Sequence, residues 1–153
     1  MKRISIFIMS LGLIWTLTSS SLKAQTISVS GTITSELVHL SYTPNGVTAQ
    51  YKDVWTGGIE GTGNTHIFSS VLIDPQTGQI IDVISKMHIF TSQGNLVLDG
   101  VGTVNYGVNL HVVATIRTGT GIYHNATGTL TSDGIIGPDG QVSTYLGTIH
   151  LDQ

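Results

Sequence analysis

The sequence contains no cysteine, which excludes disulfide bonds and the cysteine-linked lipid that anchors bacterial lipoproteins. Small exported domains often depend on disulfide bonds for their stability. Without them, this fold has to be stabilised by apolar packing and by a continuous ladder of backbone hydrogen bonds. That requirement favours a barrel, in which every strand is paired on both sides, over a loop-rich scaffold.

Charge is also scarce, because charged residues make up only 10% of the chain, whereas typical soluble domains have about 25%. Three of the six basic residues lie within the first 24 residues. The rest of the chain keeps three scattered cations against nine acidic residues, which gives a net charge of −6. Nucleic acid binding needs a basic surface, so nucleic acid is not an expected partner.

The first 24 residues have the three parts of a secretory signal. Lys2 and Arg3 precede an apolar stretch from Ile4 to Leu17, and a small polar run leads to a cleavage site after Ala24. The apolar stretch is shorter than the roughly 20 residues that a membrane span needs. We therefore predict a signal peptide over residues 1–24 and a secreted or periplasmic protein with no membrane span after cleavage.

Helical spacing of apolar residues is absent after residue 25, and alternating, β-branched runs replace it. All three prolines fall in turns between these runs, as expected when strand interiors need every N–H. Eight or nine short strands at regular spacing are typical of a barrel or a sandwich. The predicted strands are 26–34, 36–43, 47–60, 64–73, 79–90, 95–105, 109–118, 122–132 and 141–151. Together they form one predicted domain over residues 25–153.

Glycine is abundant, with 19 residues, and many of them lie inside predicted strands. There, glycine is destabilising unless a bend, a bulge or a close backbone approach requires it. The most distinctive group forms a Gly-Thr-Gly-x-aromatic-x-x-Ala-x-Gly pattern, in which two glycines permit a turn and the small residues permit close packing at a barrel bend. The residues of this structural motif are Gly119, Gly121, Tyr123, Ala126 and Gly128.

This pattern resembles the allene oxide cyclase and dirigent-protein barrels, together with small bacterial proteins of similar pattern. The likeness covers most of residues 54–151, although only the motif is distinctive. It implies an all-β fold, an eight-stranded antiparallel calycin-like barrel with a cavity, here preceded by a cleaved signal helix. It also implies a homo-dimer or homo-trimer and no metal or organic cofactor. No catalytic residue can be carried over, because the matching positions are structural.

The catalytic candidates from the residues themselves are Glu60, His111 and Arg117. On the strand 109–118, His111 and Arg117 share the face opposite the alternating apolar residues. They line a cavity only if neighbouring subunits or the N-terminal segment cover that face, and are otherwise solvated. Glu60 ends the predicted strand 47–60 that contains Trp55, where a carboxylate enclosed in an apolar pocket could hold or protonate a ligand.

Three aromatic residues, Tyr51, Trp55 and Tyr106, are the candidates for ligand binding. No metal site is predicted, because no two of the six histidines lie two or four residues apart, as zinc ligands usually do. A serine hydrolase site is equally unsupported, since the sequence has no Gly-x-Ser-x-Gly elbow.

Three functions stay open at this point. The first is an exported barrel that binds a small apolar molecule or acts as an oligomeric surface module. The second is a cofactor-free isomerase or cyclase, and the third is dirigent-like steering of a coupling reaction without catalysis by the protein itself. An interior cavity of several hundred Å³ that contains an ionisable candidate would favour an enzyme. A filled interior would exclude one.

Overall fold

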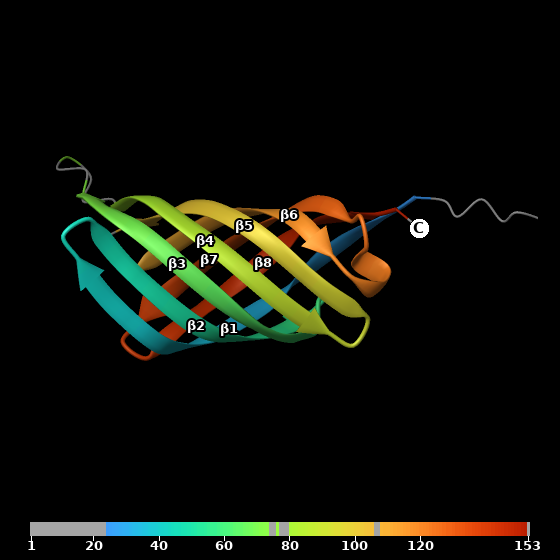
Figure 1. The fold of residues 1–153 in the computed structure, drawn as a ribbon, viewed down its shortest axis with the longest axis horizontal. Helices are drawn as coiled ribbons and strands as arrows, with labels where there is room; N and C mark the ends of the chain where they lie inside the picture. Colours follow the sequence, from blue (N-terminus) through green and yellow to red (C-terminus); the bar gives the residue numbers. More distant parts are fainter. Residues whose placement is uncertain (1–23, 74–75, 77–79, 106–107, 153) are drawn as a thin grey trace, which may run out of the picture.

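The computed structural model describes residues 24–73, 76, 80–105 and 108–152. Nearly all of the predicted signal peptide, and the ligand candidate Tyr106, lie outside these ranges. The described residues form a closed barrel of eight antiparallel strands (Figure 1). The strands are β1 (Gln25–Thr43), β2 (Gly46–Gly57), β3 (Gly61–Ile73), β4 (Ile80–Thr91), β5 (Gly94–Asn105), β6 (Asn109–Gly119), β7 (Thr127–Gly137) and β8 (Gly140–Leu151).

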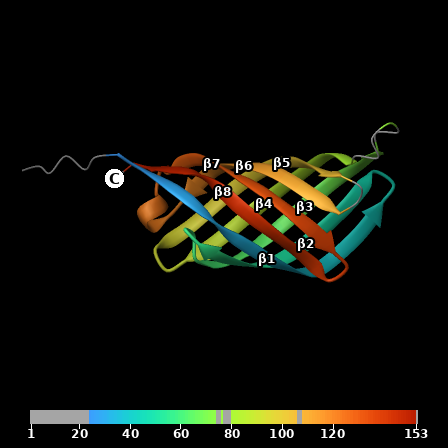
Figure 2. The same ribbon diagram turned by 180° about the vertical axis from the view of Figure 1, so that it is seen from behind.

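Each strand pairs with its neighbours in the chain, and β8 pairs with β1 to close the ladder (Figure 2). The predicted all-β, eight-stranded antiparallel barrel is thereby confirmed. The only helical element among the described residues is the 3₁₀ turn η1 (Gly121–Tyr123). None of the helices found there could span a membrane.

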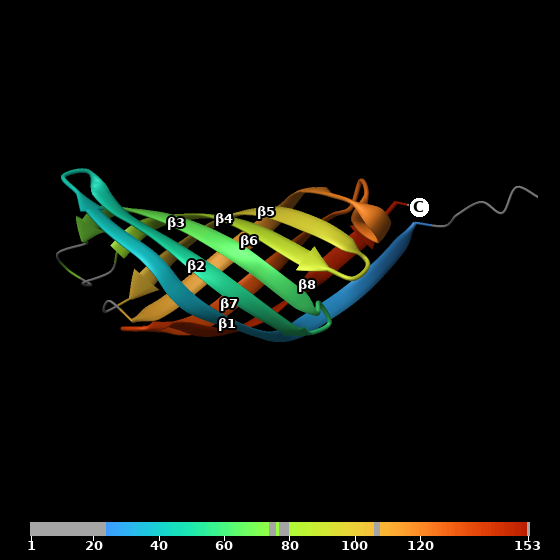
Figure 3. The same cartoon turned by 60° about the horizontal axis from the view of Figure 1, so that its bottom comes forward.

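The N-terminal strand differs from the prediction. Residues 25–43 form the single strand β1 rather than two short strands. Residues 25–36 pair with β8, residues 31–43 pair with β2, and a bulge between Leu37 and His39 adjusts the register. Because the strands are tilted, one long strand serves as the seam (Figure 3). The barrel therefore closes through the long N-terminal strand β1.

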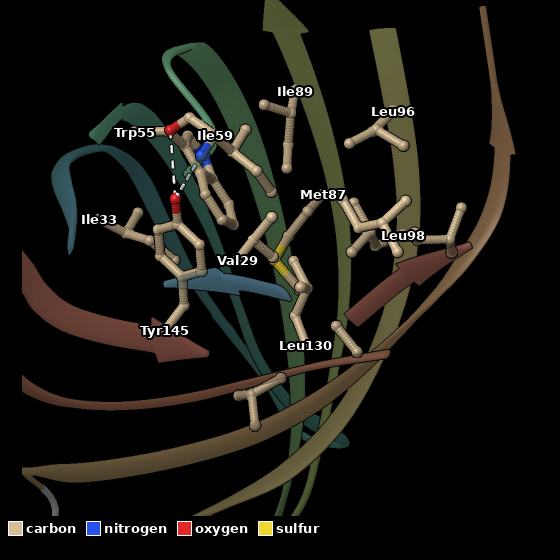
Figure 4. Packing of buried hydrophobic residues seen from close by; sticks show 14 of the residues in the cluster. Val29, Ile33, Trp55, Ile59, Met87, Ile89, Leu96, Leu98, Leu130 and Tyr145 are labelled. Atoms are coloured by element: carbon tan, nitrogen blue, oxygen red, sulfur yellow. Dashed lines mark hydrogen bonds between the residues drawn. The ribbon is translucent and has the colours of Figure 1, made fainter. Parts of the chain in front are cut away.

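One end of the barrel is filled by side chains. Five aliphatic residues there are at most 1% exposed: Ile59, Ile89, Leu96, Leu98 and Ile149. Trp55 and Tyr145 pack beside them with ring centroids 5.1 Å apart (Figure 4). The Tyr145 hydroxyl accepts a 2.8 Å hydrogen bond from the backbone N–H of Ile59, which fastens the loop between β2 and β3 over this end. We call it the closed end.

Candidate functional site

The opposite end of the barrel contains a cavity of about 360 Å³, which we call the mouth cavity. It lies beside the β1–β2 and β7–β8 hairpins, away from the chain terminus marked in Figure 1. Alternation along the strands turns apolar side chains inward to form most of its wall. These wall residues include Ala49, Ile67, Val83, Val104, Leu110 and Ile136. Tyr42, 75% exposed, stands at the rim.

A larger depression of about 740 Å³ lies on the outer surface over β1 to β4. Exposed side chains such as Glu36, Lys52 and Phe90 line it. Ligand pockets are concave, with mostly apolar walls and a small number of placed polar groups, which describes the mouth cavity better than this outer hollow. The mouth cavity is therefore the stronger candidate site.

Below the mouth cavity, inward polar side chains follow the four adjacent strands β8, β1, β2 and β3. Ser35 of β1 is the direct register partner of both Asp53 of β2 and Gln141 of β8. All three are buried. Asp53 Oδ2 accepts a 2.6 Å hydrogen bond from the Thr65 hydroxyl, and Gln141 Nε2 donates to Ser35 Oγ at 3.3 Å. We call Ser35, Asp53, Thr65 and Gln141 the polar row.

Some buried polar atoms, two of them in this row, have no hydrogen-bond partner within the part of the chain that the structure describes. They are Asp53 Oδ1, Trp55 Nε1, Ser85 Oγ, Gln141 Oε1 and Ser143 Oγ. A buried polar atom left unpaired costs about 1–3 kcal/mol. Such atoms are usually satisfied by ordered water or by a ligand, so the interior is chemically suited to hold a polar group.

A second, much smaller cavity of about 20 Å³ lies next to the mouth cavity, and Ile67 and Leu110 line both. We call it the polar niche, because four of its lining residues carry polar side chains. These are Thr65, Ser85, Ser132 and Gln141. The remaining wall is apolar. The interior thus narrows from a wide apolar chamber to a small polar recess.

Tyr51 is the one ligand-binding candidate from the sequence that lines the mouth cavity. Burial raises the pKa of its phenol, and the nearby Asp53 carboxylate raises that pKa further. The hydroxyl therefore stays protonated at neutral pH and keeps its proton for donation. Trp55, by contrast, is buried in the packing of the closed end. Tyr106 lies outside the described residues.

The three catalytic candidates are not brought together. His111 and Arg117 point outward on β6, because Leu110, Val112 and Ile116 occupy its inner face. His111 Nδ1 lies 2.6 Å from Asp133 Oδ1, and Arg117 Nε lies 2.8 Å from Asp99 Oδ2.

The third candidate, Glu60, is exposed at the closed end, where it lines a depression with Gln93 and Tyr123. None of the three candidates lines the mouth cavity or the polar niche. A chemical role for any of them stays a prediction.

The glycine motif lies at the closed end, where η1 leads from β6 into β7. Gly121 has a φ of +62°, a conformation that suits glycine far better than other residues. Tyr123 and Ala126 are both buried. Gly119 and Gly128 flank the turn, so the motif shapes the closed end and does not touch the mouth cavity.

Sequence reasoning missed the polar row, although a signal for it was present. Ala49, Tyr51, Asp53 and Trp55 alternate along β2, so an inward Tyr51 requires an inward Asp53. Nowhere among the described residues do three His, Asp or Glu side chains gather as a metal ion would require. The groups at hand are hydroxyls, an amide and one carboxyl, which are suited to hydrogen bonding.

Comparison with known proteins identifies the fold but not the function. No family model matches the sequence, and no curated protein matches it. Two solved pterocarpan synthase dirigent proteins have similar structures. One has a TM-score of 0.61 at 13% identity, over 99% of this chain and 98% of its own. The other has a TM-score of 0.60 at 14% identity, over 84% of this chain and 97% of its own.

A pyocyanin demethylase is similar as well, with a TM-score of 0.55 at 16% identity over 82% of this chain and 99% of its own. The protein therefore has a dirigent-like β-barrel fold, as the glycine motif predicted. At these identities the likeness concerns the fold alone.

Proposed function

We propose that this protein binds a small apolar molecule in the mouth cavity. The observation that carries the proposal is a cavity of about 360 Å³ at one end of the barrel that is walled by inward aliphatic side chains and has few polar groups. Ligand pockets typically measure about 300–1,000 Å³ and combine apolar walls with a small number of placed polar groups. Tyr51 and Ser69 supply such groups in the mouth cavity.

Two features support a binding role over a structural one. Filling the interior would have been the simplest way to stabilise a barrel of this size, and the closed end is filled in that way. The similar structures also include proteins named for small molecules, pterocarpan and pyocyanin. Their substrates are not carried over, because the likeness is one of fold.

The test uses the neutral apolar fluorophore N-phenyl-1-naphthylamine and the chain from residue 25 onward, which contains the complete barrel. Trp55 is the only tryptophan in that chain, so energy transfer from it reports binding to the barrel, and the two variants below locate the site. Ala49→Phe places a ring in the wall of the mouth cavity and should weaken binding at least about tenfold.

The matched control is Gln50→Phe, which adds the same ring on the outer face of the same strand. It should leave binding unchanged. Equal affinities in the two variants, or no binding to the unmodified chain, would contradict the proposal.

A specific surface feature favours a second function, association with another copy of the chain. Phe68, Ile84, Val101 and Val113 are successive register partners across β3 to β6. They form a continuous outward apolar row, 39–64% exposed, which we call the outer belt. Contiguous exposed apolar surface commonly marks an interaction site. The belt carries no charge, so the same belt on a second copy would complement it.

Sedimentation velocity tests this association. Ile84→Lys should shift the chain toward the monomer, because it places a charge in the centre of the belt. Val142→Lys, on an exposed position of β8 outside the belt, is the matched control. A chain that is monomeric at every concentration would overturn the association and leave the binding proposal untouched.

A further inference from the structure

We propose that the polar niche accepts one hydroxyl group: a single water molecule in the ligand-free protein, and the terminal hydroxyl of an apolar alcohol in the complex. The second half rests on the proposed function, since it assumes that the mouth cavity holds the ligand's apolar body. The observations concern the size of the niche, its polar atoms, its position and its charge.

The size of the niche fits one group no larger than water. A water molecule needs a cavity of at least roughly 10–15 Å³ and two to four polar partners. The niche measures about 20 Å³. A longer polar head, such as a phosphate or a sugar, exceeds it.

The polar atoms around the niche supply the required partners. Ser85 Oγ and Gln141 Oε1 are buried and without a partner among the described residues, and both residues line the niche. The hydroxyls of Thr65 and Ser132 line it too. One hydroxyl group bound there can pair with both unpartnered atoms, which removes two desolvation penalties at once.

The polar atoms around the niche are mainly hydrogen-bond acceptors, so they favour a ligand group that donates a hydrogen bond. Thr65 commits its proton to Asp53 Oδ2, so its oxygen faces other groups only as an acceptor. The amide nitrogen of Gln141 donates to Ser35, which leaves the amide oxygen Oε1, an acceptor, as the atom without a partner. An ether or a ketone has no proton to offer these acceptors. An alcohol offers one and can still accept from Ser85.

The charges around the niche disfavour both a negatively charged and a positively charged ligand group. Asp53 takes part in no ion pair of the described residues, so its carboxylate repels a ligand carboxylate that approaches the niche. An ammonium group would be attracted, but Asp53 itself does not line the niche. A cation bound there would thus be buried without direct pairing, which is costly. A neutral hydroxyl avoids both penalties.

The niche adjoins the mouth cavity, so a ligand in the mouth cavity can reach it. Ile67 and Leu110 line both cavities. Along β4, Val83 lies in the wall of the mouth cavity and Ser85, the next inward residue, lies in the niche. A linear molecule in the mouth cavity can therefore extend its end into the niche. Beyond it, the packed closed end blocks further entry.

The test compares isomers in displacement of N-phenyl-1-naphthylamine from the chain that starts at residue 25. 1-Decanol and methyl nonyl ether have the same atoms, but only the alcohol has an O–H. We expect the alcohol to bind about tenfold more tightly than the ether, the size of one buried hydrogen bond. Decanoate and decylamine at pH 7.5 should both bind more weakly than the alcohol.

Two variants assign this preference to the niche. Ser85→Ala and Gln141→Met each remove one unpartnered atom and should reduce the alcohol-to-ether ratio, while affinity for the ether stays near that of the unmodified chain. Ser143→Ala is the matched control, because Ser143 is a buried serine with an unpartnered hydroxyl outside the niche. Ser143→Ala should keep the alcohol-to-ether affinity ratio of the unmodified chain.

The outcomes separate the two proposals. Equal binding of alcohol and ether, or tighter binding of decylamine, overturns the niche proposal and leaves the mouth cavity as the binding site. Failure of the fluorophore itself to bind overturns the proposed function. A crystal structure of the ligand-free protein at high resolution gives an independent readout of the water. If no electron density for a water molecule is found between Ser85 and Gln141, the first half of the proposal is refuted.

Discussion

The hydroxyl of Thr65 donates a 2.6 Å hydrogen bond to Oδ2 of Asp53, and both side chains are buried inside the barrel. Asp53 lies on β2 and Thr65 on β3. This bond is the one side-chain hydrogen bond that Asp53 makes within the described part of the chain. The carboxyl group therefore depends on a single donor.

Thr65→Val should test that dependence, because it keeps the side-chain shape and removes the donor. We expect the free energy of unfolding in urea to fall by about 1–3 kcal/mol. Thr62→Val on the same strand is the control, since Thr62 faces outward and is exposed. Its effect should stay within about 0.5 kcal/mol. Similar small effects in both variants would show that Thr65 is not needed to satisfy Asp53.

Tyr145→Phe should loosen the closed end. The lost hydroxyl accepts from the N–H of Ile59 and donates to the carbonyl oxygen of Thr56 at 3.1 Å, so the substitution removes the hydrogen-bond partner of the buried Ile59 N–H. We expect a loss of about 1–3 kcal/mol of unfolding free energy, measured by thermal and urea denaturation. Tyr42→Phe, at an exposed rim position, is the control and should have little effect.

Stability should also fall at high pH because of two tyrosines. Burial, then the charge of Asp53, raises the pKa of Tyr51 above its ordinary value of 10.0. Burial is also the main cause that raises the pKa of Tyr145. Above pH 10 the unfolded chain therefore releases phenolic protons that the folded chain retains. Their contribution to stability is fully present below pH 10 and is lost as pH rises through the folded pKa values.

Urea denaturation between pH 8 and pH 11.5 measures this slope. Tyr51→Phe should flatten it, because the substitution removes one of the two groups responsible. The matched control is Tyr42→Phe, which removes an exposed phenol instead of a buried one. A slope that Tyr51→Phe does not change would contradict the assignment.

The two catalytic candidates on the outer face of β6, His111 and Arg117, lead to a prediction about ligand binding. His111→Ala and Arg117→Ala should leave fluorophore affinity unchanged, because both side chains lie on the outer face and neither lines the mouth cavity. His111 contacts Asp133 and Arg117 forms an ion pair with Asp99, both at exposed positions, and exposed pairs contribute little to stability, about 0–1 kcal/mol. A loss of binding in either variant would place the ligand on the outer surface of β6 instead.

Alternation made much of this arrangement predictable. The pattern of the β6 sequence put Leu110 and His111 on opposite faces, and the structure has Leu110 inside and His111 outside. The turns with proline and glycine separated most strands correctly. The same rule applied to β2 would have identified Asp53 as an inward group. Tyr51 and Asp53 lie two residues apart on one strand, so predicting one inward position fixes the other.

Alternation along single strands could not predict the register in which the barrel closes, or the polar niche. The register between β1 and β8 joins residues more than a hundred positions apart, such as Ser35 and Gln141. No local pattern specifies that pairing. The polar niche depends on the same register, because it brings Gln141 to the interior beside Thr65 and Ser85. Long-range pairing therefore decided which polar residues meet.

Export provides the last prediction. We propose that the chain is secreted or periplasmic after cleavage between Ala24 and Gln25, on the strength of the charged, apolar and small-residue segments of residues 1–24. β1 begins at Gln25, which pairs directly with Leu151 of β8, so cleavage there would leave the whole barrel ladder intact. Expression of the full-length chain in a bacterium, followed by fractionation and intact-mass spectrometry, should find a product that begins at Gln25 outside the cytoplasm. Full-length protein retained in the cytoplasm or membrane fraction would contradict export, and replacing Ile8 and Leu11 with Asp should retain the chain inside the cell by disrupting the apolar segment.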